Sequence, residues 1–229
     1  MEHPYLLFVQ LFDLLGLEHF ASAYKHVIYS WVVMLILIVV GALSAKNLSL
    51  IPGKAQNLFE IIISGIENFM VSITGEEGRW FFPLAATIAL YVFVSNMLGL
   101  IPGFFPPTAN INTPLSCAIV VFVFTHFIGV KYHGIKYVKH FLGPSLALAW
   151  LMLPIEVIGH LARVLSLTFR LFGNMMGHEL VLMILFGLAG AFFAPLPIMG
   201  LGILVCFIQA FIFFILSVMY FAGAMEEAH

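Results

Sequence analysis

Charged residues are scarce in this sequence of 229 residues: Asp, Glu, Lys and Arg together make up 9%, and the formal net charge is −2 at pH 7. Hydrophobic residues make up 62%, and the mean hydropathy of +1.10 lies outside the range of soluble domains. The sequence therefore predicts an integral membrane protein. Since it has no basic patch, nucleic acid is excluded as a partner.

Cysteine is equally rare, and the motifs of common active sites are missing. The two cysteines, Cys117 and Cys206, lie in apolar runs without another metal ligand at usable spacing, so we interpret both as small buried hydrophobic residues. No metal-ligand pair, glycine-rich phosphate loop or nucleophile–base arrangement is found. We therefore expect no metal, no cofactor and no enzyme activity of the isolated chain.

What the sequence has is long apolar runs, which predict an all-α polytopic membrane protein with about five membrane helices. Barrel strands would instead appear as alternating segments of about ten residues. The elements predicted within one integral membrane domain (1–229) are spans at 26–43, 80–101 and 114–130, an amphipathic surface helix at 54–73, a long helix at 145–194 and a last helix at 200–225. Acidic residues outnumber Lys25 before the first run, so we expect no secretory signal and a retained first span.

The apolar stretch at 145–194 is too long for an upright span. As a helix it would measure about 75 Å, against a hydrocarbon core of about 30 Å. Two alternatives follow: the helix breaks near Pro154, or most of it tilts steeply, by up to about 65°. We expect the tilted helix to curve along a neighbour.

Lysines predict the orientation of the spans. Lys46 and Lys54 follow the first span, and Lys131, Lys136 and Lys139 follow the third, whereas the loop at 102–113 is uncharged. Because cytoplasmic loops carry the excess of Lys and Arg, we expect the N-terminus outside and the C-terminus in the cytoplasm.

Arg170 lies at the centre of a polar and small-residue stripe on the long helix. At about 100° per residue, the residues within about 60° of it include Glu156, Gly159, Arg163, Ser166, Gly173, Asn174 and Gly177. Glycines four residues apart let membrane helices approach closely. An arginine at the membrane centre costs about 2.5–3.5 kcal/mol on insertion scales, so a function, by default an ion pathway, is the expected reason for it.

The sequence offers Arg170 no acidic partner within one helical turn. Glu179 lies about 180° around the helix from it, so we expect its counter-charge to come from another chain. Glu156 and Arg163 share a face and are predicted to form a structural ion pair.

Two histidines lie near the edge of this stripe. We interpret His160 as a buried interior histidine. For His178, beside Glu179, a structural role and a role in proton relay both remain open.

The run LSLTFRLFGNMMGHEL at 165–180 resembles the signature of subunit a of F-type ATP synthases. Agreement continues, in order, in SNMLGLIPG at 95–103, PTANINTPLS at 107–116, the stretch 156–163, and QAFIFFILSVMYF at 209–221 followed by Glu226 and Glu227. The resemblance covers spans two to five well, and the first 60 residues in layout only.

The resemblance implies a non-catalytic stator subunit beside a ring of c subunits, with two offset half-channels that carry protons to and from a ring carboxylate. Arg170 matches the essential arginine that faces this carboxylate. The residues implied along the proton path are Glu156, Arg163, Ser166, Asn174, His178, Glu179 and Gln209, and the close-contact face comprises Gly159, Gly173 and Gly177. Glu179 matches the acid of the external half-channel, but Gly202 stands where some members carry its histidine partner. Relay through His178 and relay through water alone therefore both stay open.

The implied partners are the c-ring, the stator subunit b and, indirectly, the catalytic F1 head, in a bacterial plasma (inner) membrane. The sequence disfavours two other functional classes. A secondary transporter would predict internal repeats and broken helices, which the sequence lacks. A purely structural assembly subunit would leave Arg170 without a reason.

Overall fold

The structure is a computed structural model that describes residues 23–46, 53–101, 103–134, 137, 149–189 and 195–226. Over these residues every regular element is helical. The elements are α3 (Lys25–Lys46), α4 (Lys54–Thr74), η1 (Glu76–Phe81), α5 (Phe82–Leu98), η2 (Pro107–Ala109), α6 (Asn112–His133), α8 (Ala149–Ala189) and α9 (Pro195–Met225). Five helical stretches are long and apolar enough to cross a membrane: Lys25–Ser44, Glu76–Leu98, Asn112–His133, Trp150–Leu185 and Pro197–Met225. The predicted all-α membrane fold is confirmed.

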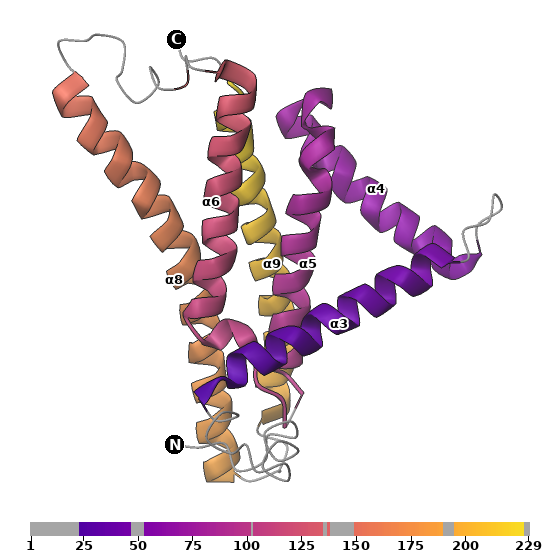
Figure 1. The fold of residues 1–229 in the computed structure, drawn as a ribbon. Helices are drawn as coiled ribbons and strands as arrows, with labels where there is room; N and C mark the ends of the chain where they lie inside the picture. Colours follow the sequence, from indigo (N-terminus) through magenta and orange to yellow (C-terminus); the bar gives the residue numbers. More distant parts are fainter. Residues whose placement is uncertain are drawn as a thin grey trace.

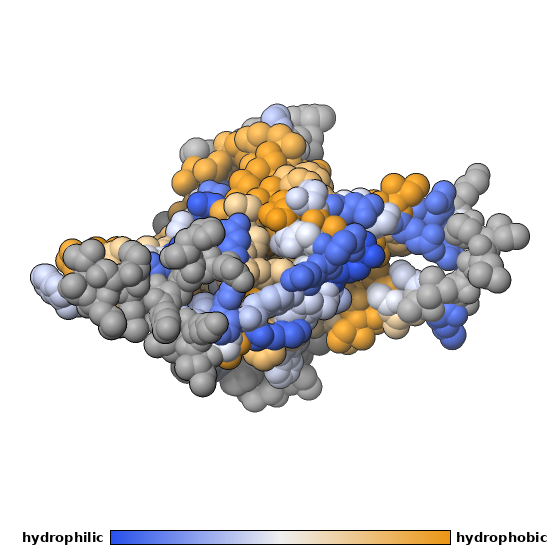
Figure 2. Space-filling view, turned by 90° about the horizontal axis from the view of Figure 1, so that it is seen from above, coloured by the Kyte–Doolittle hydropathy of each residue, from blue (hydrophilic) through white to orange (hydrophobic). Residues whose placement is uncertain are grey.

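The helices α5, α6 and α9 stand side by side, and α8 leans obliquely against α6 and α9 (Figure 1). Toward its N-terminal end α8 diverges from α6, whereas α3 and α4 extend from the other side of the bundle (Figure 1). Viewed from the end where α6 and α9 finish, polar surface gathers over the bundle and apolar surface lies around it (Figure 2). This distribution fits a bundle whose sides face lipid and whose end faces water.

Large apolar side chains from α5, α6, α8 and α9 meet in one core. Its fully buried members include Val92, Val121, Ile128, Leu171, Phe213, Val218 and Phe221. Edge-to-face contacts add order at one end, where the ring of Phe221 lies 5.2 Å from that of Phe81 and 5.4 Å from that of Phe124. The buried cysteines Cys117 and Cys206 fill space in the same core, as predicted.

The predicted amphipathic helix is α4. Its C-terminal part packs on α9, with Met70 fully buried and the ring of Phe69 5.8 Å from that of Phe211. Its N-terminal part leaves Ile61 and Ile62 exposed. The helix ends at Gly75, whose φ of 74° is open to glycine without strain.

The long helix α8 runs without interruption from Ala149 to Ala189, so the alternative of a break near Pro154 is wrong. Pro154 lies close to the start of α8. It lacks the N–H that would donate to the carbonyl of Trp150, so α8 loses one hydrogen bond near its end, and a proline is tolerated there. The outer parts of the predicted range, 145–148 and 190–194, lie outside the described residues. The last helix begins at Pro195, ahead of the predicted residue 200, because proline fits the first turn of a helix.

Buried polar contacts fix the turn between α5 and α6. The hydroxyl of Thr108 donates to Asn96 Oδ1 at 2.6 Å, and the hydroxyl of Tyr29 in α3 donates to the carbonyl of Gly103 at 3.3 Å. Gly103 has a φ of 92°, which favours glycine. This turn lies at the opposite end of the bundle from the end of α9 (Figure 1).

Candidate functional site

The two faces of α8 differ as the helical periodicity predicts. Leu167, Leu171 and Met175 are buried against the bundle, at 3%, 0% and 2% exposure. The opposite face carries Arg170 and Gly173, both exposed. The helix therefore presents its polar and small residues outward while it anchors itself by an apolar face.

Arg170 projects from this outward face. Its Nη2 lies 3.5 Å from the hydroxyl of Ser166, one turn earlier on the same face, which is the outer limit of a hydrogen bond. Among the described residues no carboxylate lies within ion-pair distance of its guanidinium. The prediction that no acid within one turn of α8 pairs with Arg170 agrees with this geometry.

The glycines of the stripe leave the surface beside Arg170 open. A Cβ placed on Gly159, Gly173 or Gly177 would meet no atom within 4 Å. The described part of the chain thus leaves this side of α8 uncovered; we call the surface over these three glycines the open groove, and a second backbone can approach Arg170 there.

Asn174 connects the stripe to α9. Its side-chain Nδ2 donates to Gln209 Oε1 at 2.8 Å, and Gln209 is buried at 3% exposure. The family resemblance implies both residues along the proton path, and the structure joins them by this hydrogen bond. A polar path therefore leads from the exposed face of α8 into the contact between α8 and α9.

His178 lies on the side of α8 that meets α9, away from the open groove. Its Nε2 is 3.3 Å from the carbonyl oxygen of Ile198, and a Cβ on Gly202 would collide with its imidazole. The glycine thus provides the space that the histidine occupies. Glu179, the next residue, is half-buried.

Glu156 and Arg163 have different neighbours. Glu156 Oε1 lies 3.3 Å from Nε2 of His160, whereas the guanidinium of Arg163 lies over the ring of Tyr220 in α9, 5.6 Å from its centroid. The structure does not pair Glu156 with Arg163, so the predicted ion pair between them is wrong. His160 is buried at 7% exposure, as predicted.

Sequence reasoning missed His126, which lies against His160, and Tyr137, which contacts His126. The ring centroid of His126, from α6, is 4.9 Å from that of His160, and His126 Nδ1 is 2.8 Å from the hydroxyl of Tyr137. Burial raises the pKa of Tyr137 above its usual value; nearby Arg163 opposes this shift and Glu156 adds to it. Tyr137 is therefore a neutral phenol at physiological pH. The only sequence signal was a histidine in the middle of an otherwise uncharged apolar run.

The sequence of the chain is similar to those of known proteins. The family described as ATP synthase A chain matches residues 27–222. Proteins named ATP synthase subunit a are similar over their full length and the full length of this chain: 73% identity over 229 residues in Desulfosudis oleivorans, and 57% over 239 residues in Syntrophobacter fumaroxidans. A third, from Geotalea daltonii, is 57% identical over 232 residues, again covering both chains completely. The chain belongs to the ATP synthase A chain family.

Proposed function

We propose that this chain is the proton-translocating stator subunit of a bacterial F-type ATP synthase, and that Arg170 faces a carboxylate on a neighbouring ring of c subunits. The relatives are named as a subunit of the synthase, so the chain acts as a membrane subunit of that complex and has no catalytic activity alone. Protons enter through one half-channel, bind the ring carboxylate, and leave through a second, offset half-channel after the ring has turned.

The exposed Arg170 carries this proposal. It is a permanent cation on a helix apolar enough to span a membrane, without an acidic partner among the described residues and beside an open groove of glycines. A ring carboxylate that enters this groove supplies the counter-charge. The arginine in turn lowers the pKa of that carboxylate, so that it releases its proton there, and a fixed positive charge keeps protons from passing directly between the half-channels.

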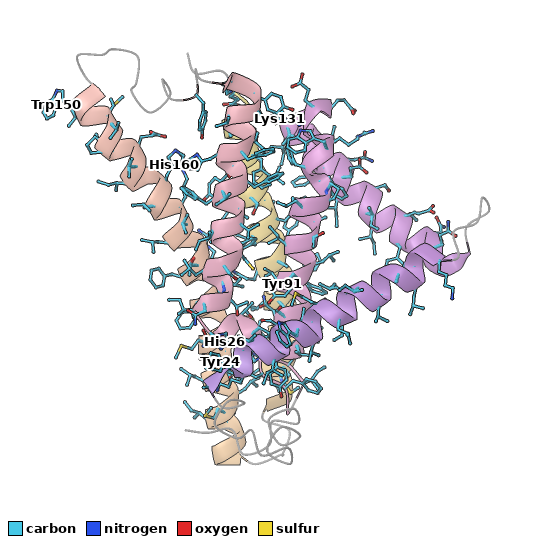
Figure 3. The ribbon with its side chains drawn as sticks, viewed as in Figure 1. Tyr24, His26, Tyr91, Lys131, Trp150 and His160 are labelled. Atoms are coloured by element: carbon cyan, nitrogen blue, oxygen red, sulfur yellow. The ribbon has the colours of Figure 1, made fainter. Side chains whose placement is uncertain are left out.

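The remaining site residues divide between the two ends of α8. Glu179 and His178 belong to the external half-channel, and Glu156, with Arg163 and Ser166, to the cytoplasmic one. Asn174 and Gln209 orient groups close to Arg170. In this arrangement the end of the bundle where α6 and α9 finish, which carries Lys131, faces the cytoplasm (Figure 3), and this puts the C-terminus inside and the N-terminus outside.

The proposed partners are those that membership of the ATP synthase A chain family implies. The glycine stripe of α8 meets the c-ring, subunit b holds the chain as part of the stator, and both connect it to the F1 head. The surrounding solvent is the lipid of the bacterial plasma membrane.

The test is Arg170→Ala and Arg170→Lys in the assembled synthase, in inverted membrane vesicles. Alanine should abolish both ATP-driven pumping and ATP synthesis, and should permit passive proton leak once F1 is stripped off. Lysine should not restore synthesis, because an ammonium group is a hydrated point charge that can lose its proton when buried, whereas guanidinium stays charged.

Leu161→Ala is the matched control, because Leu161 is exposed on α8 but lies about 180° around the helix from Arg170. Its pumping should remain normal. Full ATP synthesis in Arg170→Ala, at normal assembly levels, would refute the proposal.

A further inference from the structure

Four side chains that can bind or share protons form a row where α8 approaches α6. Glu156 Oε1 is 3.3 Å from His160 Nε2, the rings of His160 and His126 are 4.9 Å apart, and His126 Nδ1 is 2.8 Å from the hydroxyl of Tyr137. His160 projects from α8 toward α6 (Figure 3). The row thus runs from a partly exposed carboxylate, across two imidazoles from different helices, to a buried phenol.

The packing around the row holds the imidazoles in place. Phe122, one turn before His126, meets it edge to face at 4.4 Å and lies 6.2 Å from the ring of His160. The ring of Tyr137 is held by close packing on Gly129, where a Cβ would collide with it. Aromatic contacts of this kind fix ring orientation, which proton exchange between neighbouring groups requires.

A crevice lies beside this row, where α6, α8 and α9 meet. It is lined by Phe122 and Thr125 of α6, His160, Arg163 and Leu167 of α8, and Tyr220 of α9. Leu167 lies one turn before Arg170 on the same helix. His160 therefore lines the crevice and also lies 3.3 Å from the carboxylate of Glu156.

The charges that face the two histidines limit how many protons they can hold. Glu156 favours an imidazolium, whereas Arg163, on the same helix, disfavours it; among the described residues, Tyr137 and Tyr220 are further titratable groups at the site. Two adjacent imidazolium groups would repel each other at this separation, with the cation of Arg163 nearby. The site is consequently suited to one proton shared by His126 and His160, with Glu156 as its counter-charge.

We propose that His126 and His160 form a proton-exchange site that loads and unloads Glu156 at the cytoplasmic end of the proton path, a role that rests on the proposed function. On exit, the protonated carboxyl of Glu156 gives its proton to Nε2 of His160, which leaves a carboxylate and an imidazolium. The imidazolium then releases the proton on its other nitrogen, Nδ1, to His126 or to water. Entry runs through the same steps in reverse.

The proposal is tested by passive proton flow through the membrane sector of inverted vesicles from which F1 has been stripped, driven by a potassium diffusion potential. The outer face of such vesicles is the cytoplasmic face, so its pH can be varied. Histidine ordinarily titrates between about pH 5 and 8, and wild-type flow should show a step in this range. In His160→Gln the step should disappear, and proton flow near neutral pH should fall about tenfold. This loss is smaller than the contribution of a general acid–base group in a dry site, because the Glu156 side chain is 33% exposed and water can reach it.

Two more variants separate exchange from structure. His126→Gln should flatten the same step while the chain keeps its assembly, and Glu156→Gln should add little to the loss already caused by His160→Gln, because groups in series are not additive. His133→Gln is the matched control, since His133 lies two turns further along α6 and outside the row; its pH profile should match wild type.

A pH step that persists unchanged in an assembled His160→Gln variant would overturn the proposal. If neither histidine variant assembles, the wild-type profile decides: absence of a step in the histidine range would overturn it equally. Neither result touches the role of Arg170, whose own test is coupled synthesis in Arg170→Ala.

Discussion

The hydrogen bond between Asn174 and Gln209 gives a prediction whose size can be worked out from the structure. The bond joins α8 to α9 at 2.8 Å, and Gln209 is only 3% exposed. In soluble proteins, leaving a buried amide without its partner costs about 1–3 kcal/mol. Between membrane helices the measured coupling is smaller, about 0.6 kcal/mol on average and about 1.7 at most, because the unfolded helices in the membrane also find partners. We therefore expect a coupling energy of about 0.6–1.7 kcal/mol for this pair.

The measurement is a double-mutant cycle of Asn174→Ala, Gln209→Ala and the double variant. The chain is unfolded in mixed micelles by increasing SDS and followed by the fluorescence of its three tryptophans. Thr168→Ala with Gln209→Ala is a suitable control cycle, because the hydroxyl of Thr168 bonds within α8, to the carbonyl of Val164. A coupling for Asn174 and Gln209 within about 0.3 kcal/mol of zero would mean that the two substitutions simply add, and the reasoning would fail.

Two further outcomes are expected from the assembled synthase. Glu179→Gln removes a titratable relay from the external half-channel, so proton pumping should slow while assembly stays normal; wild-type pumping rates in that variant's membranes would contradict the assignment. Gly173→Leu places a large side chain in the open groove where a Cβ meets nothing within 4 Å, so the chain should fold and insert normally yet fail to retain the c-ring on purification. Retention of the ring at wild-type levels would show that the groove is not the contact.

Much of the fold could be predicted because membrane helices obey few rules. An uncharged run of helical length is enough to locate α6, and the 100° rotation per residue is enough to place Arg170 outward and Leu171 inward on α8. The interpretation of His160, at the edge of the stripe, as an interior histidine is confirmed, since it is 7% exposed. These results depend only on the hydropathy and the rotation of a single helix, and these can be read from its own sequence.

Contacts between helices were harder to predict. His126 and His160 lie on different helices, and nothing in their local sequence indicates that their rings meet. Similarly, Glu156 and Arg163 share a face, but Arg163 lies over the ring of Tyr220 in α9, while His160, one turn from Glu156, lies 3.3 Å from its carboxylate. Such pairings depend on how α8 leans against α6 and α9, which packing across the whole bundle decides.

The separation of Arg170 and Glu179 along α8 bears on why the proposed mechanism needs a rotating ring. Nine residues place the two side chains about 13.5 Å apart along the helix axis and about 180° apart around it. Glu179 is half-buried, and its neighbour His178 contacts α9, whereas Arg170 faces the open groove. The fixed charge of Arg170 lies between Glu179 and Glu156 along α8, where it opposes the direct passage of a proton. Under the proposed function it must instead travel on the ring carboxylate through a turn of the ring, so the placement of one arginine and one glutamate on opposite faces of a helix couples proton flow to rotation.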